Sequence, residues 1–293
     1  MLLIQRFLTL ARIIGLLFIA VALAACSAIQ LGYNTLPQVS AWWLDGYVDF
    51  SDDQAQRVRE DIARLHQWHR REELPKLSTL LLQAERMATG NVTADGACAV
   101  VPAVRLRLLA VAERAEPAAV TLALNLSPEQ LTHIERKYEK NVRDYRKEWL
   151  DLSPEELQDK RFKQYLDRME MIYGPLNDAQ RTTMRTQTRK SVFDVELNLQ
   201  ERQRRQQDIL QALRKLAGQP VSLSDARAAI HRLIERGLQS PDPRYHAYQE
   251  ALIQEGCRNI AAVHNSTTPQ QRQSAVRRLR AYQRDLGELS AQP

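Results

Sequence analysis

Two histidines one helical turn apart have the spacing of a metal site. His66 and His69 lie at positions i and i+3, with Glu72 and Glu73 shortly after them. If this segment is helical, two imidazoles and a carboxylate lie on adjoining faces, and zinc and related metals accept these ligands. Two such ligands do not close a site, and a solvated or hydrogen-bonded polar face explains the same residues. The favoured expectation is therefore no metal site and no cofactor.

Motifs of other catalytic classes are absent from the sequence. It has no glycine-rich phosphate loop, no Gly-x-Ser-x-Gly elbow and no His-Glu-x-x-His motif. Its many carboxylates are spaced as on the solvated faces of amphipathic helices. We therefore expect a protein that is not an enzyme. A metal-dependent hydrolase that uses His66 and His69 is the less favoured alternative.

The N-terminal segment has the plan of an export signal. Arg6 and Arg12 supply positive charge, residues 13–25 form an apolar tract, and no acidic residue precedes Cys26. The tract is too short to span a bilayer comfortably, which favours a cleaved signal peptide over residues 1–25. An uncleaved signal anchor, or an ordinary signal peptide with a chance cysteine, is the alternative.

The run Leu23-Ala24-Ala25-Cys26 resembles the lipobox of bacterial lipoproteins. That resemblance implies cleavage before Cys26, acylation of its thiol with chains such as palmitate, and a membrane-tethered mature protein. Ser27 lacks the aspartate that the resemblance associates with inner-membrane retention. The expected location is therefore the periplasmic face of the outer membrane. Several acyl chains anchor firmly, because each buried methylene contributes about 0.8 kcal/mol.

Two cysteines remain if Cys26 is acylated. Cys98 and Cys257 would then lie in an oxidising compartment, where disulfides persist. An even remaining pair fits one bridge, and so long a loop would contribute about 5 kcal/mol in the chain-entropy model. We expect a disulfide between Cys98 and Cys257, with two separate buried thiols as the alternative.

Composition and charge exclude further classes. The 293-residue chain has 41 basic and 35 acidic residues and a formal net charge of +6. This mildly basic, mixed pattern is weaker than that of nucleic-acid-binding proteins, so no nucleic-acid partner is expected. Glycine is scarce, and the common residues Arg, Gln, Glu, Leu and Ala are those that favour helices. We expect an all-α protein.

Five short motifs mark helix N-termini. Each places a capping side chain three residues before Glu or Gln, so that the cap accepts from the backbone while the later side chain reaches back. Three of them have proline at the first helical position, where no N–H is needed. The five caps are Ser51, Ser127, Ser153, Asn177 and Thr268.

The apolar spacing between these motifs is helical. We expect Pro75 to end or kink the first helix of the domain and Pro117 to break a later one. The longest predicted helix runs from about 178 to 216. Its stretch 200–208 is polar on every side, which predicts a segment that is exposed or bridges subdomains.

No shift in composition divides the mature chain into separate domains. We expect a signal peptide over residues 1–25 and a lipidated tether with an aromatic segment over residues 26–50. An elongated multi-helix domain would then cover residues 51–293.

Aromatic residues concentrate just before the first capping motif. Trp and Tyr suit a membrane interface or a binding surface, because one end of each ring is polar. The favoured interpretation is that these aromatics pack into the helical core. The candidate binding surface combines this segment with a basic aromatic run: Trp42, Trp43, Tyr47, Trp68, His69 and Arg70.

Four runs together carry a family resemblance: residues 42–49 (WWLDGYVD), 68–71 (WHRR), 126–131 (LSPEQL) and 202–207 (RQRRQQ). As a set they are similar to an uncharacterised family of bacterial lipoproteins, a domain of unknown function. The resemblance covers most of the mature chain. It implies export, lipidation and helicity, and it brings no catalytic residue.

A second resemblance lies in the capping motifs Leu126-Ser127-x-x-Gln130, Leu176-Asn177-x-x-Gln180 and, more loosely, Phe50-Ser51-x-x-Gln54. They resemble the Leu-Thr-x-x-Gln signature of Spy and CpxP-type periplasmic proteins, which are small curved helical dimers that bind unfolded chains or sensors. Helix capping alone produces the same letters, and this is the favoured interpretation.

The expected function follows from the anchor and from the lack of a catalytic motif. We expect a non-enzymatic binding or structural role in the cell envelope. Its expected contacts are the membrane, through the acyl chains on Cys26, and a protein or envelope-polymer partner. A chaperone-like helical protein that binds unfolded clients is the main alternative.

Overall fold

The computed structural model describes residues 29–292, so the predicted signal peptide and Cys26 lie outside the described residues. This part of the chain is helical nearly throughout and contains no strand, which confirms the all-α prediction. Its first helix covers residues 29–48. The later α-helices are α2 (Asp52–Trp68), α3 (Leu74–Met87), α4 (Ala94–Cys98), α5 (Val101–Leu124), α6 (Pro128–Tyr145), α7 (Pro154–Tyr173), α8 (Asp178–Arg189), α9 (Val195–Gly218), α10 (Leu223–Leu238), α11 (Pro243–Asn265) and α12 (Pro269–Ala291), with two π-helical turns, η1 (His69–Glu73) and η2 (Arg146–Leu150).

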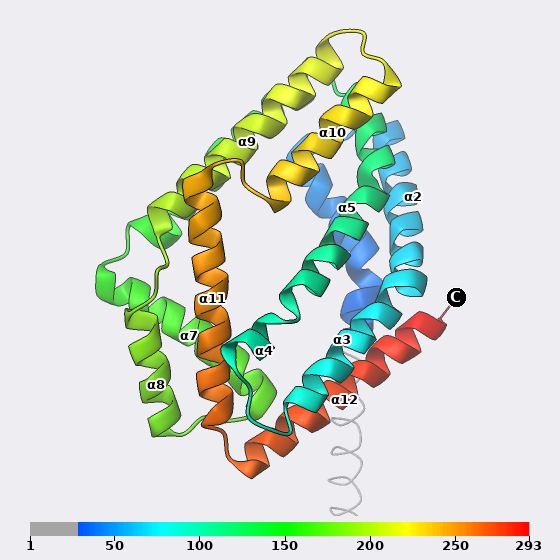
Figure 1. The fold of residues 1–293 in the computed structure, drawn as a ribbon. Coiled ribbons are helices and arrows are strands. Elements are labelled where there is room, and N and C mark those ends of the chain that lie inside the picture. Colours follow the sequence, from blue (N-terminus) through cyan, green and yellow to red (C-terminus); the bar gives the residue numbers. More distant parts are fainter. Residues whose placement is uncertain (1–28, 293) are drawn as a thin grey trace, which may run out of the picture.

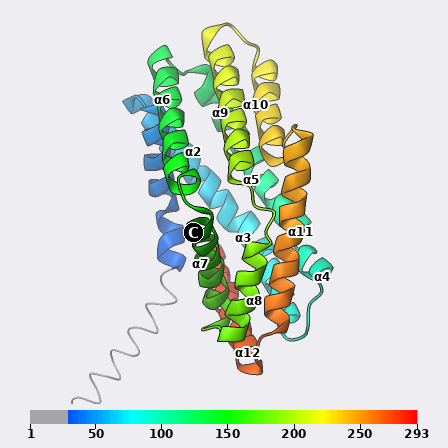
Figure 2. The same cartoon turned by 90° about the vertical axis from the view of Figure 1, so that its left-hand side faces the viewer.

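The helices pack in pairs to form an elongated frame (Figure 1). α3 lies along α12, α5 along α10 and α6 along α9, while the short α4 packs on α11. Figure 2 shows helix 29–48 and α6 toward one side of the molecule, with α10, α11 and α4 toward the other. Partners in these pairs are often far apart in the sequence, so the frame depends on long-range contacts.

The buried apolar side chains form three clusters, one for each region of the frame. The cluster around Met184 joins α3, α7, α8, α11 and α12. The cluster around Ala226 joins α5, α9 and α10. The third joins helix 29–48 to α6 and α9 through Val48, Ile134 and Leu210. Helix 29–48 is therefore packed on the body, and the elongated shape follows from several small cores.

All five predicted capping boxes are present. In each, the cap side chain accepts from the backbone N–H three residues later, and that residue's side chain accepts from the N–H of the cap. Pro128, Pro154 and Pro269 occupy the first helical position, as predicted. The starts of α2, α6, α7, α8 and α12 are therefore encoded locally.

Two of these boxes, those of α2 and α6, are joined across helices. Gln130 Nε2 donates to Gln54 Oε1 at 2.6 Å, and Gln54 Nε2 donates back to Gln130 Oε1 at 3.2 Å. Gln130 also donates to Asp49 O, and Gln54 also donates to Asn125 O, each at 2.9 Å. Each of these carbonyls lies two residues before the cap of the other helix. Each glutamine amide thus uses both donors and both acceptor sites.

The same arrangement recurs between α8 and α12. Gln180 Nε2 donates to Gln271 Oε1 at 2.8 Å, and Gln271 Nε2 donates to Gln180 Oε1 at 3.1 Å. The remaining N–H groups donate to Ser266 O at 2.9 Å and Pro175 O at 2.8 Å. Gln180 is 2% exposed, so this polar group is buried with all its hydrogen bonds made.

Regular α-helix is interrupted just before Pro75, where a helix end or kink was predicted, but it is not interrupted at Pro117. The π-helical turn η1 joins α2 to α3 directly before Pro75, and Leu74 N donates to His69 O across it. A proline lacks the N–H and crowds the carbonyl four residues earlier, and a wider turn gives it room. Pro117 lies inside α5, so the predicted break there is wrong.

The predicted helix over 178–216 is in fact two helices. α8 ends at Arg189 and α9 begins at Val195. Between them, Val192 N donates to Glu255 Oε2 of α11 at 2.7 Å, and Asp194 caps α9. A carboxylate 63 residues away thus binds a backbone group that a continuous helix would have used.

The disulfide is present as predicted. It joins Cys98 at the end of α4 to Cys257 in α11, with the two Cα atoms 5.4 Å apart. The two residues are 159 positions apart in the sequence. The bridge therefore ties the middle of the chain to its C-terminal helices.

We expect the paired glutamines to stabilise the fold more than an isolated capping box does. Gln180→Ala leaves the amide of Gln271 and the carbonyl of Ser266 without their partner, so the free energy of unfolding should fall by about 3 kcal/mol. Glu156→Ala removes a capping box in which the side chain of Glu156 accepts only from its own cap, Ser153. The free energy of unfolding should then fall by about 1 kcal/mol or less. Urea unfolding measures both, and equal losses would contradict the role given to the pair.

The disulfide should contribute to stability through the unfolded chain. We expect Cys98→Ser combined with Cys257→Ser to lower the free energy of unfolding by about 2 to 5 kcal/mol. In the folded protein, neither Cys98 nor Cys257 should react with a maleimide until a reductant is added. Reaction of both thiols without reductant would show that the bridge does not form.

Candidate binding cleft

One cleft of about 660 Å³ is rich in aromatic side chains, which are seven of the fifteen residues that line it. Helix 29–48, α6, η2, α9, α11 and the segment between α8 and α9 all contribute to it. We call it the aromatic cleft. The rings that line it are Trp43, Tyr47, Tyr138, Tyr145, Trp149, Phe193 and Tyr245.

The rings contact one another in two groups. On one wall, the centroids of Trp43 and Tyr47 are 4.5 Å apart. On the other, Trp149 lies 6.3 Å from Tyr145 and 5.8 Å from Phe193. These separations are typical of favourable ring pairs, which fix the rings in place. Trp43 is 54% exposed, so its ring remains open to a ligand.

Hydrogen bonds hold the tyrosines of the cleft in position. Asn141 Nδ2 donates to the Tyr47 hydroxyl at 2.8 Å, and the Tyr145 hydroxyl donates to Val195 O at 3.2 Å. Burial raises the pKa of Tyr138 to about 12, and neighbouring Tyr47 adds to the shift. Tyr138 therefore stays neutral, and the tyrosines of the cleft serve as surfaces and hydrogen-bonding groups.

One of the glutamine pairs joins two helices that line the cleft. Gln130, in the first turn of α6, donates to Asp49 O just after the end of helix 29–48. Helix 29–48 carries Tyr47, and α6 carries Tyr138. The capping interaction at the start of α6 therefore sets the position of these two rings relative to each other.

Two arginines add positive charge among the rings. The guanidinium carbon of Arg202 lies 5.0 Å from the centroid of Tyr145, and that of Arg205 lies 5.9 Å from the centroid of Tyr245. Arg205 also pairs with Glu201 at 2.6 Å. Among residues 29–292, no carboxylate lies within ion-pairing distance of Arg202. Arg202 therefore presents a positive charge that an acidic ligand can meet.

Glu201 is the buried acceptor beneath these arginines. Its side chain is 3% exposed and accepts from Arg204 at 2.7 and 2.8 Å, from Arg205 and, at 2.9 Å, from Ser240. Burial alone would raise the pKa of Glu201, but these three hydrogen-bond donors outweigh it and lower the pKa to about 2. Stretch 200–208 was predicted to be exposed or to bridge subdomains. Glu201 is buried, and it contacts Ser240 of another segment.

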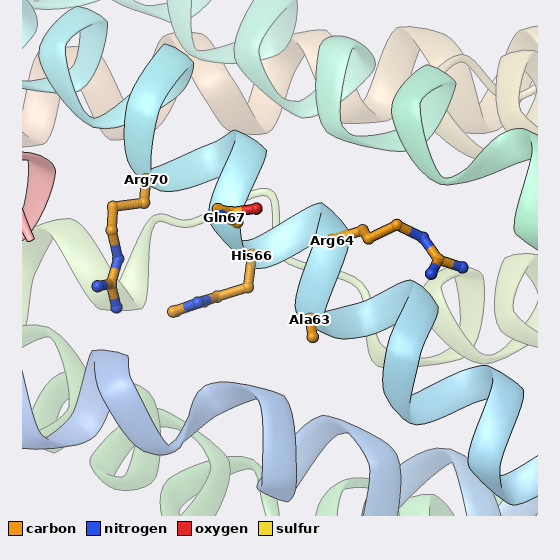
Figure 3. A pocket seen from close by; sticks show the side chains of 5 residues that line it. All are labelled: Ala63, Arg64, His66, Gln67 and Arg70. Atoms are coloured by element: carbon orange, nitrogen blue, oxygen red, sulfur yellow. The ribbon is translucent and has the colours of Figure 1, made fainter. Parts of the chain in front are cut away.

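His66 and His69 bind helix 29–48. His66 Nε2 donates to Tyr33 O at 3.0 Å, and His69 Nδ1 lies 3.0 Å from the Tyr33 hydroxyl. Figure 3 shows the His66 side chain beside that of Arg70 in a pocket of about 340 Å³. Burial lowers the pKa of both histidines. In the described part of the chain, no three His, Cys, Asp or Glu residues are grouped as metal ligands.

Arg70 is a buried link between distant segments. It is 9% exposed and donates to Asn34 Oδ1 at 2.6 Å and to Gln292 Oε1 at 3.3 Å. It thus joins η1 to helix 29–48 and to the end of α12. Trp68 is half-buried, with the Arg114 guanidinium 5.8 Å from its ring.

The six candidate binding residues therefore fall into two groups. Trp43 and Tyr47 line the aromatic cleft, and Trp42 lies beside them on the same helix, 75% exposed. The run from Trp68 to Arg70 lies at the other end of that helix, where His69 and Arg70 serve packing. The structure does not bring the two groups together.

Sequence patterns did not identify most of the residues that line the cleft. Tyr145 lies in a helical apolar stripe, and Arg202 lies in a polar run without an apolar face. A helix with charged side chains on every face needs partners for them from other elements. The polar run was therefore the available sequence signal for a site at this place. Trp149, Phe193 and Tyr245 lie on η2, the α8–α9 segment and α11. No sequence pattern around these residues indicates that the three segments converge.

Comparison with known proteins assigns the chain to a family. The family described as a family of unknown function (DUF6279) matches residues 46–226. The chain belongs to this family. The family resemblance of the sequence runs is thereby confirmed, while the lipobox and Spy-type resemblances stay predictions. No curated protein and no solved structure matches the chain.

The matched range of DUF6279 contains α6, η2 and α9, and with them most of the aromatic cleft. It excludes Trp43 and Tyr245, which complete the cleft from helix 29–48 and α11. Over residues 29–292, none of the helices in this DUF6279 chain has both the length and the apolar character needed to cross a bilayer.

Glu201 should make stability depend on pH in the acid range. Its pKa is lowered from 4.5 to about 2 in the folded protein, so its stabilising effect is complete above pH 4.5 and is lost as the pH falls toward 2. We expect Glu201→Gln to lower the free energy of unfolding at pH 7 by about 3 kcal/mol.

The difference between Glu201→Gln and the unmodified chain should shrink between pH 4.5 and pH 3, as measured by urea unfolding at each pH. Glu196→Gln changes an exposed residue of the same helix and should have no such effect. A difference that is the same at both pH values would contradict the assignment to Glu201.

Proposed function

We propose that this chain is a non-enzymatic envelope lipoprotein that binds a protein partner in the aromatic cleft. In this proposal, acylated Cys26 holds it at the periplasmic face of the outer membrane. The observation that carries the proposal is the gathering of seven rings and two arginines, from six segments of the chain, around one cleft. Pockets lined by aromatic side chains with a few placed polar groups are typical binding sites.

The residue types in the cleft favour a protein ligand. Trp, Tyr and Arg are the side chains that dominate the binding energy of protein interfaces, because they offer large contact areas with a polar or charged end. Arg202 lies over Tyr145 and has no acidic partner among the described residues, so a carboxylate on the ligand would pair with it. We therefore expect a protein segment that carries an acidic residue beside an apolar one.

Catalysis is not part of the proposal. His66 and His69 were the candidates for a metal-dependent enzyme, and both contact Tyr33 of helix 29–48. They lie away from the aromatic cleft, which contains neither of them. The cleft supplies surfaces and charge for binding.

Photo-crosslinking in intact cells tests the proposal. A photo-reactive residue in place of Gln206, which lines the cleft, should capture one defined protein. The same residue in place of the exposed Glu139, on α6 but outside the cleft lining, should not. Capture of envelope polymer instead of protein, or no capture from Gln206, would contradict the proposed partner.

Arg202→Glu should lower the yield of the Gln206 crosslink by about tenfold, which corresponds to about 1.4 kcal/mol of binding energy. Arg136→Glu changes another exposed arginine, outside the cleft, and is the matched control. Because Arg202 has no structural ion pair in the described chain, the variant should unfold at the unmodified temperature. An unchanged yield in a folded Arg202→Glu protein would show that the cleft is not the binding site.

A further inference from the structure

Helix 29–48 has one face that packs on the body of the protein. Tyr33 binds His66 and His69, Tyr47 accepts from Asn141, and Val48 is 8% exposed in the third apolar cluster. The helix is therefore held along its length, at both its first and its last turns. Its orientation relative to the body is fixed.

Another face of this helix is apolar and exposed, and it borders the aromatic cleft at Trp43. Five large apolar side chains on it are between 46% and 75% exposed, namely Leu31, Leu36, Val39, Trp42 and Trp43. At 100° per residue they fall within less than half of the helix circumference. Asp45 is the one charged residue between positions 29 and 48. Figure 2 shows helix 29–48 at an edge of the molecule.

We propose that this face lies in the interfacial layer of a lipid bilayer. The inference rests on the acyl anchor of the proposed function, since Ile29 is three positions after Cys26 and their Cα atoms can be at most about 11 Å apart. The start of the helix must then stay close to the lipid headgroups. A helix of this length is about 30 Å long and, lying flat, would place its whole apolar face against the membrane.

The side chains of the face suit this environment. Trp42 and Trp43 have rings with an apolar body and a polar N–H, which favour the layer between headgroups and acyl chains. Arg59 of α2 lines the same shallow recess as Trp42 and has no ion-pair partner among the described residues, so it can meet a lipid phosphate. The helix would thus orient the protein on the membrane, while the acyl chains hold it there.

Quenching of tryptophan fluorescence by brominated lipids tests the inference on the full acylated chain. The protein is reconstituted into vesicles of phosphatidylglycerol and phosphatidylcholine brominated on its acyl chains. The chain has four tryptophans, and Trp68→Phe with Trp149→Phe leaves only Trp42 and Trp43 to emit. Relative to unbrominated vesicles, we expect this emission to fall by about twofold.

The matched control is Trp42→Phe with Trp43→Phe, which leaves Trp68 and Trp149 on the body. Its emission should be the same in both kinds of vesicle. Circular dichroism confirms that each variant is folded. Emission from Trp42 and Trp43 that bromine does not reduce would overturn the membrane contact and leave the anchor and the cleft intact. A chain that carries no acyl group and does not float with the vesicles would overturn the anchor as well.

Discussion

Reciprocal hydrogen bonding between capping glutamines is the interaction on which the frame depends. A helix start normally leaves backbone N–H groups without partners, and a capping box satisfies them locally. Here Gln54 with Gln130, and Gln180 with Gln271, each close a box and also bind the turn before the other helix. Two helix starts are thus fixed against each other without a large apolar core. This matters because the buried apolar residues are divided among three small clusters.

The cleft inherits its geometry from one of these pairs. Gln130 ties the start of α6 to the end of helix 29–48, and Glu255 of α11 accepts from Val192 N in the α8–α9 segment. Rings from elements far apart in the sequence can therefore form one lining. Glu201 plays the corresponding role for charge, because it pairs with Arg204 and Arg205, and Asp208 is a second partner of Arg204, while Arg202 stays available. The same fixed geometry leaves the apolar face of helix 29–48 exposed.

The local part of this structure could be predicted from the sequence, and the long-range part could not. The caps at Ser51 and Thr268 are set by side chains within three residues, so the pattern identified them. Pro117 misled the prediction, because α5 accommodates it inside the helix. The break after Arg189 depends on Glu255, and the histidines' contacts depend on Tyr33, so neither is visible in local spacing. The disulfide was predictable on the expectation that Cys26 is acylated, which leaves two cysteines to pair.

A double-mutant cycle on Gln54 and Gln130 tests the central claim most directly. The free energy of unfolding is measured for Gln54→Ala, for Gln130→Ala, for the double variant and for the unmodified chain. Since each amide binds the other, the two losses should not add, with a coupling energy of about 0.5 to 3 kcal/mol. Losses that add within about 0.3 kcal/mol would mean that each glutamine caps only its own helix and that the frame is held in another way.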